Sequence, residues 1–137
     1  MNKIVFYYSN KKFYQFKQKI NFYLKKTLQL FKKNNVLIEV YLLSDNEMAK
    51  VNYHLHKIEK PTNVLSLVNN VPRPDSKLQV LGEIYLAPDW IKKQNLFTIE
   101  YLAVHGVLHI LGFDHIKKSD SIKMKSVENK IIKCSLL

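Results

Sequence analysis

Three of the five histidines in this chain lie in one short segment, His105-Gly-Val-Leu-His109-Ile-Leu-Gly112-Phe-Asp-His115. His105 and His109 are four residues apart, so on a helix they share one face, one turn apart. Gly112 is the residue type that ends a helix in a left-handed conformation, which would bring His115 back toward that face. Three converging imidazoles form the ligand set of a catalytic zinc site that leaves one position for water. We therefore predict one Zn²⁺ per chain, although nickel, copper and iron accept the same ligands.

The same histidine spacing occurs in metzincin proteases, where a glutamate directly after the first histidine is the general base. That position is Gly106 in this chain, and glycine cannot accept a proton from water. The sequence therefore disfavours peptide hydrolysis while it keeps the metal-binding pattern. Asp114 is the nearest carboxylate, and two roles stay open for it. It is either a turn residue after Gly112, or a catalytic group that acts on the water or orients a ligand histidine.

The elements that must position these residues follow from the hydrophobic periodicity of the chain. Alternating and β-branched runs predict strands over residues 2–8, 36–43, 63–68 and 80–86. Helical spacing and capping residues predict helices over 11–33, from Ser44 to about His56, after Pro88, after Thr98, and from Ser119 or Asp120. We expect an α+β fold, a small mixed four-stranded sheet packed with four to five helices, in a single domain spanning residues 1–137. The three-histidine metal site would lie on a central helix.

The composition bounds the setting of this site. The formal net charge is +11, which favours a polyanionic partner such as nucleic acid, but a general drift toward lysine codons explains it equally well, because only Arg73 is an arginine. The single Cys134 cannot form an internal disulfide. The first ten residues lack the apolar core of a signal peptide, and no apolar run approaches the roughly 20 residues of a membrane span. We expect a cytoplasmic protein with no membrane partner.

The histidine segment closely resembles the signature of the YbeY family, the metal-dependent endoribonucleases of ribosomal RNA maturation. That signature reads His-Gly-x-Leu-His-Leu-x-Gly-Tyr-Asp-His, and Ile110 and Phe113 are conservative replacements in it. The resemblance covers roughly residue 36 to the end of the chain. Outside the histidines it rests on Asn52, the segment Lys60-Pro61-Thr62-Asn63-Val64-Leu65-Ser66, the strand Leu81-Gly82-Glu83-Ile84, and Met124 and Glu128 in the last helix.

The resemblance implies a zinc-dependent endoribonuclease specific for single-stranded RNA. Its substrates would be ribosomal RNA (rRNA) precursors, including the 3′ end of the small-subunit rRNA, and it would serve ribosome quality control. The ribosome and ribosome-assembly proteins are the partners that the resemblance implies. The main alternative is a ribosome- or RNA-binding assembly factor whose zinc site is structural or vestigial.

The resemblance also assigns candidate roles to residues outside the histidine segment. His56 stands where the family usually has an arginine implicated in catalysis, and a histidine lacks the fixed bidentate fork of arginine on phosphate. We expect His56, Lys57 and Lys60 to line the cleft and steady the phosphate. Asn63 and Ser66 are candidate hydrogen-bonding partners of RNA, although strand residues at these positions can be purely structural.

Overall fold

The structure is a computed structural model that describes residues 1–69, 77–113 and 118–136, and for 118–122 and 133–136 only the helical backbone. Asp114 and His115, two of the predicted site residues, lie outside the described residues. The fold is α+β, as the sequence predicted, with a mixed four-stranded sheet and, among the described residues, five α-helices and one 3₁₀ helix.

The four strands lie in the order β1-β2-β4-β3. Strand β1 pairs in parallel with β2, β2 in parallel with β4, and the edge strand β3 runs antiparallel to β4. Their bounds are Lys3–Tyr8 for β1, Val36–Leu42 for β2, Val64–Val68 for β3 and Gln79–Leu86 for β4. Each strand lies within two residues of its predicted range.

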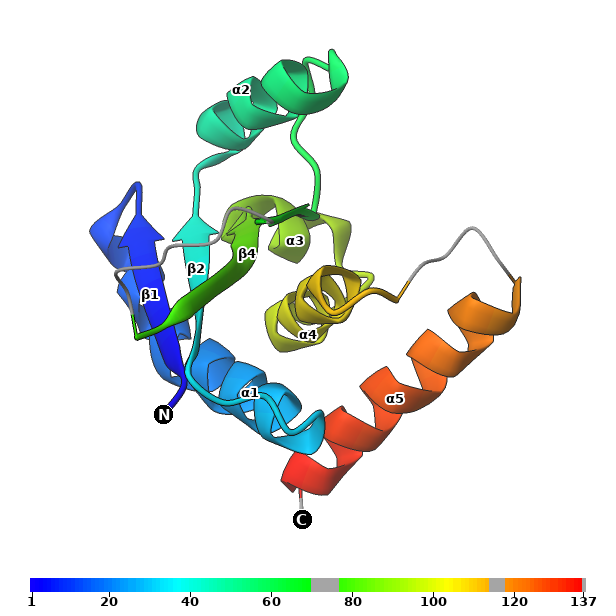
Figure 1. The fold of residues 1–137 in the computed structure, drawn as a ribbon. Coiled ribbons are helices and arrows are strands. Elements are labelled where there is room, and N and C mark those ends of the chain that lie inside the picture. Colours follow the sequence, from blue (N-terminus) through cyan, green and yellow to red (C-terminus); the bar gives the residue numbers. More distant parts are fainter. Residues whose placement is uncertain (70–76, 114–117, 137) are drawn as a thin grey trace.

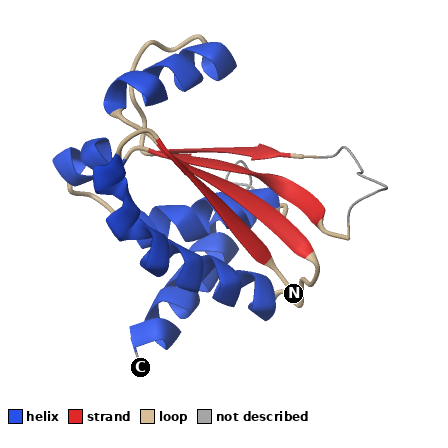
Figure 2. Ribbon diagram, turned by 90° about the vertical axis from the view of Figure 1, so that its left-hand side faces the viewer, coloured by secondary structure: helices blue, strands red, loops and turns tan. Residues whose placement is uncertain are grey.

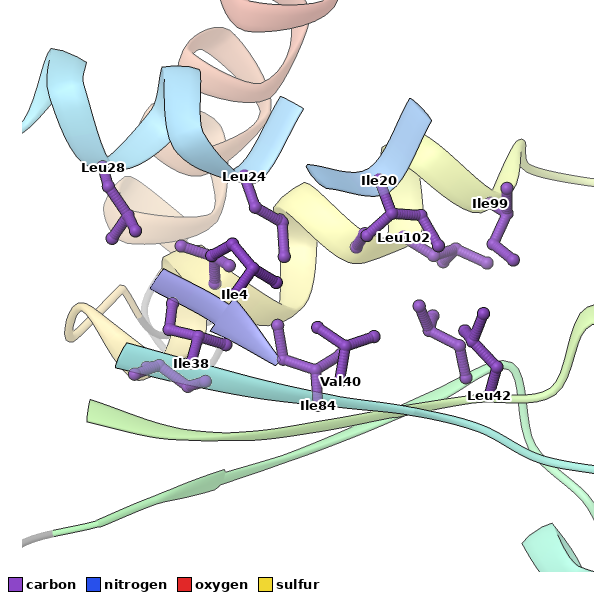
Figure 3. Close-up of a cluster of buried hydrophobic side chains, with 14 of the residues drawn as sticks. Ile4, Ile20, Leu24, Leu28, Ile38, Val40, Leu42, Ile84, Ile99 and Leu102 are labelled. Atoms are coloured by element: carbon purple, nitrogen blue, oxygen red, sulfur yellow. The ribbon is translucent and has the colours of Figure 1, made fainter. Parts of the chain in front are cut away.

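Helices cover one face of this sheet (Figure 2). Side chains alternate between the two faces of a strand, and every second residue of β2 from Val36 to Leu42 is buried. These side chains meet Ile4 of β1, Ile84 of β4, and the inward residues of the helices in one apolar core (Figure 3). The opposite face carries a row of three stacked tyrosines, whose neighbouring ring centroids are 4.7 Å apart: Tyr7, Tyr41 and Tyr85.

The helices are η1 (Lys11–Phe16), α1 (Lys17–Leu30), α2 (Asp45–His56), α3 (Pro88–Gln94), α4 (Ile99–Ile110) and α5 (Lys118–Leu136). The predicted capping box begins α2, where the Ser44 side chain accepts a hydrogen bond from the amide of Glu47. Helix α2 stands apart from the other helices at the top of both overall views (Figures 1 and 2). Helix α4 lies between the sheet and α5, so it is the central helix of the layer.

One element differs from the prediction, because residues 11–33 do not form a continuous α-helix. The chain makes the 3₁₀ helix η1 first, and the Asn10 side chain caps it by accepting from the amide of Lys12. Phe13 and Phe16 fall on the same side of this turn and both reach the core, because residues three apart are neighbours in a 3₁₀ helix as they are in an α-helix. The spacing of these apolar residues therefore fits either kind of helix and does not reveal the 3₁₀ turn.

Helix α5 joins the domain through a second apolar cluster. Met124 and Ile131 of α5 are buried against Val104 and Leu108 of α4 and Tyr23 of α1. This packing fixes the inner face of α5 against the helix that carries His105 and His109. Among the described residues, no helix is both long and apolar enough to cross a lipid bilayer.

Candidate metal centre

Both ends of α4 are capped, so the helix that carries the histidines has a defined start and a defined end. The Thr98 hydroxyl accepts from the amide of Tyr101, as predicted for its first turn. At the other end, the amides of Gly112 and Phe113 bond to the carbonyls of His109 and Leu108 at 3.0 Å. This is a Schellman motif, and Gly112 has the positive φ of 104° that it requires. The chain therefore leaves α4 where the sequence predicted.

The side chains of His105 and His109 converge on one side of α4. Their Nε2 atoms are 3.2 Å apart, and their rings lie 4.7 Å apart at an interplanar angle of 76°. Two nitrogens that each bind one zinc ion at about 2.0–2.1 Å in a tetrahedron lie about 3.3 Å apart. The spacing of the two Nε2 atoms therefore fits two ligands of a common Zn²⁺.

The third predicted ligand, His115, is outside the described residues, so the three-histidine site itself is not shown. Within the part of the chain that the structure describes, no group of three or more His, Cys, Asp or Glu side chains is arranged to hold a metal. Asp114 is likewise outside this part, so its two candidate roles stay open.

Glu128 of α5 contacts the far side of the His105 ring. Its Oε1 lies 3.0 Å from Nδ1 of His105, and the Glu128 side chain is only 1% exposed. A carboxylate at this distance favours the tautomer in which Nδ1–H donates to it and Nε2 keeps its lone pair. Carboxylate–histidine pairs of this kind orient metal-binding histidines and raise their basicity. The contact with Glu128 therefore suits a role for Nε2 of His105 as a metal ligand.

Gly106 lies on the side of α4 that faces the sheet. A Cβ added there would lie 3.1 Å from Cγ2 of Ile84, so glycine lets α4 approach β4 closely. A glutamate at this position would have to enter the packed interface between helix and sheet. The position used by the metzincin base is therefore occupied by a packing contact, which supports the sequence argument against peptide hydrolysis.

A cleft of about 370 Å³ opens beside His105. Its walls come from the start of β3 and the two residues before it, from α4 and the residue before its cap, and from α5. The lining residues are Thr62, Asn63, Val64, Phe97, Tyr101, Leu102, His105, Lys125 and Glu128. Asn63 is thus the one predicted RNA contact that shares a cleft wall with His105.

The other predicted RNA contacts lie outside the lining of this cleft. His56 ends α2, and Lys57 and Lys60 are exposed in the segment that follows. The buried Asn52 holds this segment, because its Nδ2 donates to the carbonyl of Lys60 over 2.8 Å. Ser66 pairs with Ile84 across β3 and β4, so its side chain lies on the face of the sheet that the helices cover. His56, Lys57 and Lys60 are therefore not among the described residues that line this cleft, and their contact with RNA stays a prediction.

Tyr101 lines the cleft, and its ring lies beside those of Phe97 and His105. Burial, followed by the neighbouring Glu128 carboxylate, raises the pKa of Tyr101 to about 12. The phenol is therefore neutral at physiological pH and keeps a proton that it can donate. Its ring is nearly parallel to that of His105, with centroids 6.5 Å apart.

The sequence analysis gave no role at the site to Glu128, Tyr101 or Lys125. A signal for Glu128 was present, because it falls four residues after Met124 on the buried side of α5, where a carboxylate needs a partner. Tyr101 precedes His105 by one helical turn, so it had to share the histidine face. Lys125 gave no signal, since lysines occur throughout the chain.

The chain is similar in sequence to proteins of one known family. The family model described as Endoribonuclease YbeY matches residues 6–135. A protein named Endoribonuclease YbeY from Wolbachia pipientis is 37% identical, over 69% of this chain and 65% of that protein. Its namesake from Buchnera aphidicola is 35% identical, over 80% of this chain and 77% of that protein. The match therefore spans about two thirds of the length of the Wolbachia relative.

A solved structure shares the fold. The solution structure of a Thermotoga maritima protein aligns with 97% of this chain and 87% of its own, at a TM-score of 0.60 and 23% identity. The family match begins at residue 6, so it extends the sequence resemblance back through α1 and into β1. The chain therefore belongs to the YbeY family of endoribonucleases.

Proposed function

We propose that this protein is a zinc-dependent endoribonuclease that cleaves single-stranded rRNA precursors. The observation that carries the proposal is the pair of Nε2 atoms of His105 and His109, 3.2 Å apart, with Glu128 behind His105. The names of the relatives supply the reaction class, and the lysines of a chain with a net charge of +11 suit an RNA substrate.

In this proposal His105, His109 and His115 hold one Zn²⁺. The donor set fits the ion, because two of these imidazoles already have the spacing of common ligands and one has its carboxylate partner. When bound, Zn²⁺ would supply a Lewis acid that stabilises negative charge on the phosphodiester and lowers the pKa of water, so that hydroxide is available as the nucleophile near neutral pH.

The residues of the chain do the positioning. Glu128 holds the His105 ring in one orientation and tautomer. Lys125 of α5 lines the same cleft as His105, and its positive charge would attract a phosphate there. Asp114 is our candidate for accepting the proton of the attacking water or for orienting His115. His56, Lys57 and Lys60 are exposed and outside the lining of the cleft, where they would contact the RNA backbone.

A ribosome-binding assembly factor with a structural zinc is the second candidate function. The observation that favours it is the exposed position of His56, Lys57 and Lys60 outside the cleft, since an exposed basic segment binds RNA without cutting it. This candidate predicts RNA binding that survives chelation and no cleavage at any zinc concentration.

The test is cleavage of a single-stranded rRNA fragment by wild type, His109→Ala and the control His54→Ala. His54 is an exposed histidine of α2 outside the cleft, so its loss removes an imidazole and leaves the site intact. We expect cleavage by wild type and His54→Ala, sensitivity to chelation, and no cleavage by His109→Ala. Equal cleavage by all three proteins would overturn the proposal.

We extend the proposal to the cell through the family alone. The protein would act in the cytoplasm, on the 3′ end of the small-subunit rRNA and in ribosome quality control. Its protein partners would be the ribosome and ribosome-assembly proteins.

A further inference from the structure

Three aromatic rings that line the cleft form a row, in the order Phe97, Tyr101 and His105. The rings of Phe97 and Tyr101 are nearly parallel, with centroids 5.3 Å apart and an interplanar angle of 8°. Tyr101 in turn stacks beside His105 at 6.5 Å and 23°. Phe97 is 48% exposed, although it is large and apolar. The outer end of the row is therefore open to a ligand.

The structural role of Phe97 does not account for this placement. An apolar residue just before a helix cap commonly packs on the fourth residue of the helix, as a hydrophobic staple. Here the cap is Thr98 and the fourth residue is Leu102, yet the ring of Phe97 lies parallel to Tyr101, the third. Phe97 keeps its ring along the wall of the cleft, where it lines the same space as His105.

Two polar groups complete the chemistry of the cleft. The buried Oδ1 of Asn63 has no hydrogen-bond partner among the described residues, which is unusual for a buried acceptor. Asparagine amides are common hydrogen-bonding partners of base edges. Lys125 supplies a positive charge on the wall from α5. A volume of about 370 Å³ lies within the range of small-ligand sites.

A flat aromatic group, a hydrogen-bonding edge and a negative charge are together the properties of a nucleotide. We propose that Phe97 and Tyr101 form a stacking shelf for the nucleobase next to the scissile phosphate, with Asn63 as its hydrogen-bond partner and Lys125 on the phosphate. This inference rests on the proposed RNA substrate. The shelf explains how a small cleft grips an unpaired strand, because only an unstacked base is free to lie on an aromatic ring.

The experiment measures binding of a short single-stranded RNA that carries one fluorescent aminopurine base, whose emission falls when it stacks. The full chain is kept in chelator so that the RNA stays intact, and wild type is compared with Phe97→Ala and Phe97→Tyr. Phe22→Ala is the matched control, because Phe22 is 53% exposed on α1, away from the cleft. A second RNA replaces the fluorescent nucleotide with an abasic one, and cleavage of the unlabelled RNA by zinc-loaded wild type is measured in parallel.

We expect Phe97→Ala to lose the quenching and to weaken RNA binding by about 5- to 150-fold, the usual effect of losing one stacked base. Phe97→Tyr keeps the ring and should bind as wild type does. Wild type should bind the abasic RNA more weakly by the same factor. Phe97→Ala should bind the two RNAs equally well, because the substitution and the abasic site remove the same interaction. If wild type binds and cleaves RNA while Phe97→Ala shows the same quenching and RNA affinity as Phe22→Ala, the shelf is refuted and the proposed function stands. If wild type neither binds nor cleaves RNA, the proposed function fails and the shelf falls with it.

Discussion

At the scale of single residues, the contact between His105 and Glu128 would decide which ring nitrogen binds the proposed metal. The 3.0 Å contact between Nδ1 and Oε1 engages one side of the ring and directs Nε2 toward His109. Without the carboxylate the imidazole could rotate or hold its proton on Nε2, and either change removes a ligand. The affinity for zinc should therefore depend on a residue that never touches the ion.

Substitution of Glu128 tests this dependence. We expect Glu128→Ala to weaken zinc binding by about 10–100-fold, the usual effect of losing the partner of a metal-binding histidine. Glu128→Gln should weaken it less, because the amide oxygen still accepts from Nδ1–H. Competition with a chromophoric chelator measures the affinity, and circular dichroism checks the fold. The control is Glu59→Ala, at an exposed glutamate outside the cleft. Unchanged affinity in Glu128→Ala would show that the contact has no role in metal binding.

At the scale of elements, the C-terminal end of α4 determines the direction of the chain after His109. The Schellman motif turns the chain at Gly112 and sends Phe113 onto Phe31, with ring centroids 5.6 Å apart. The chain thus leaves the helix in a fixed direction just before Asp114 and His115. A change at Gly112 should disturb both the stability of the domain and the third proposed ligand.

We expect Gly112→Ala to lower the free energy of unfolding by about 1–2 kcal/mol, because a side chain disfavours the left-handed region. An added Cβ would meet nothing within 4 Å, so the loss reflects backbone strain and no steric clash. Gly112→Asn should lose less, since asparagine tolerates this region better. Urea denaturation measures the stability, and the chelator competition measures zinc affinity. An alanine variant as stable as wild type would contradict this account of the helix end.

At the scale of the whole molecule, charge and shape act together. In the proposed function, the net charge of +11 would attract RNA from any direction, whereas the cleft beside His105 would select one position on it. Most lysines should therefore affect RNA binding weakly and alike. Lys125 should stand out, because it alone among the lysines of the described residues lines that cleft.

The salt dependence of RNA binding separates these two roles. For single strands, the logarithm of the binding constant falls with the logarithm of salt concentration by about 0.7 per neutralised phosphate. We expect Lys125→Ala to reduce this slope by about 0.7. The control Lys130→Ala, at an exposed position later in α5, should leave it nearly unchanged. Fluorescence anisotropy across a salt series measures the slope. Equal effects of the two substitutions would mean that the cleft binds no phosphate.

The sequence was most informative where the signal is local. Periodicity and caps predicted all four strands and the helix that carries the histidines, because these depend on neighbouring residues. The continuous helix over 11–33 was wrong, because apolar residues three apart, such as Phe13 and Phe16, fit a 3₁₀ helix as well as an α-helix. The cleft could not be derived from sequence, because its walls meet only through folding. For this reason Lys125 was missed, whereas the burial pattern of α5 carried a signal for Glu128.

The central claim is that one zinc ion held by the histidines makes this protein a ribonuclease. The most direct measurement adds zinc stepwise to metal-stripped protein and follows the rate of cleavage of a single-stranded rRNA fragment at each step. We predict that the rate rises linearly and stops rising at one zinc per chain, and that His109→Ala stays inactive throughout. Full cleavage by the stripped protein, or none at any zinc content, would contradict the claim.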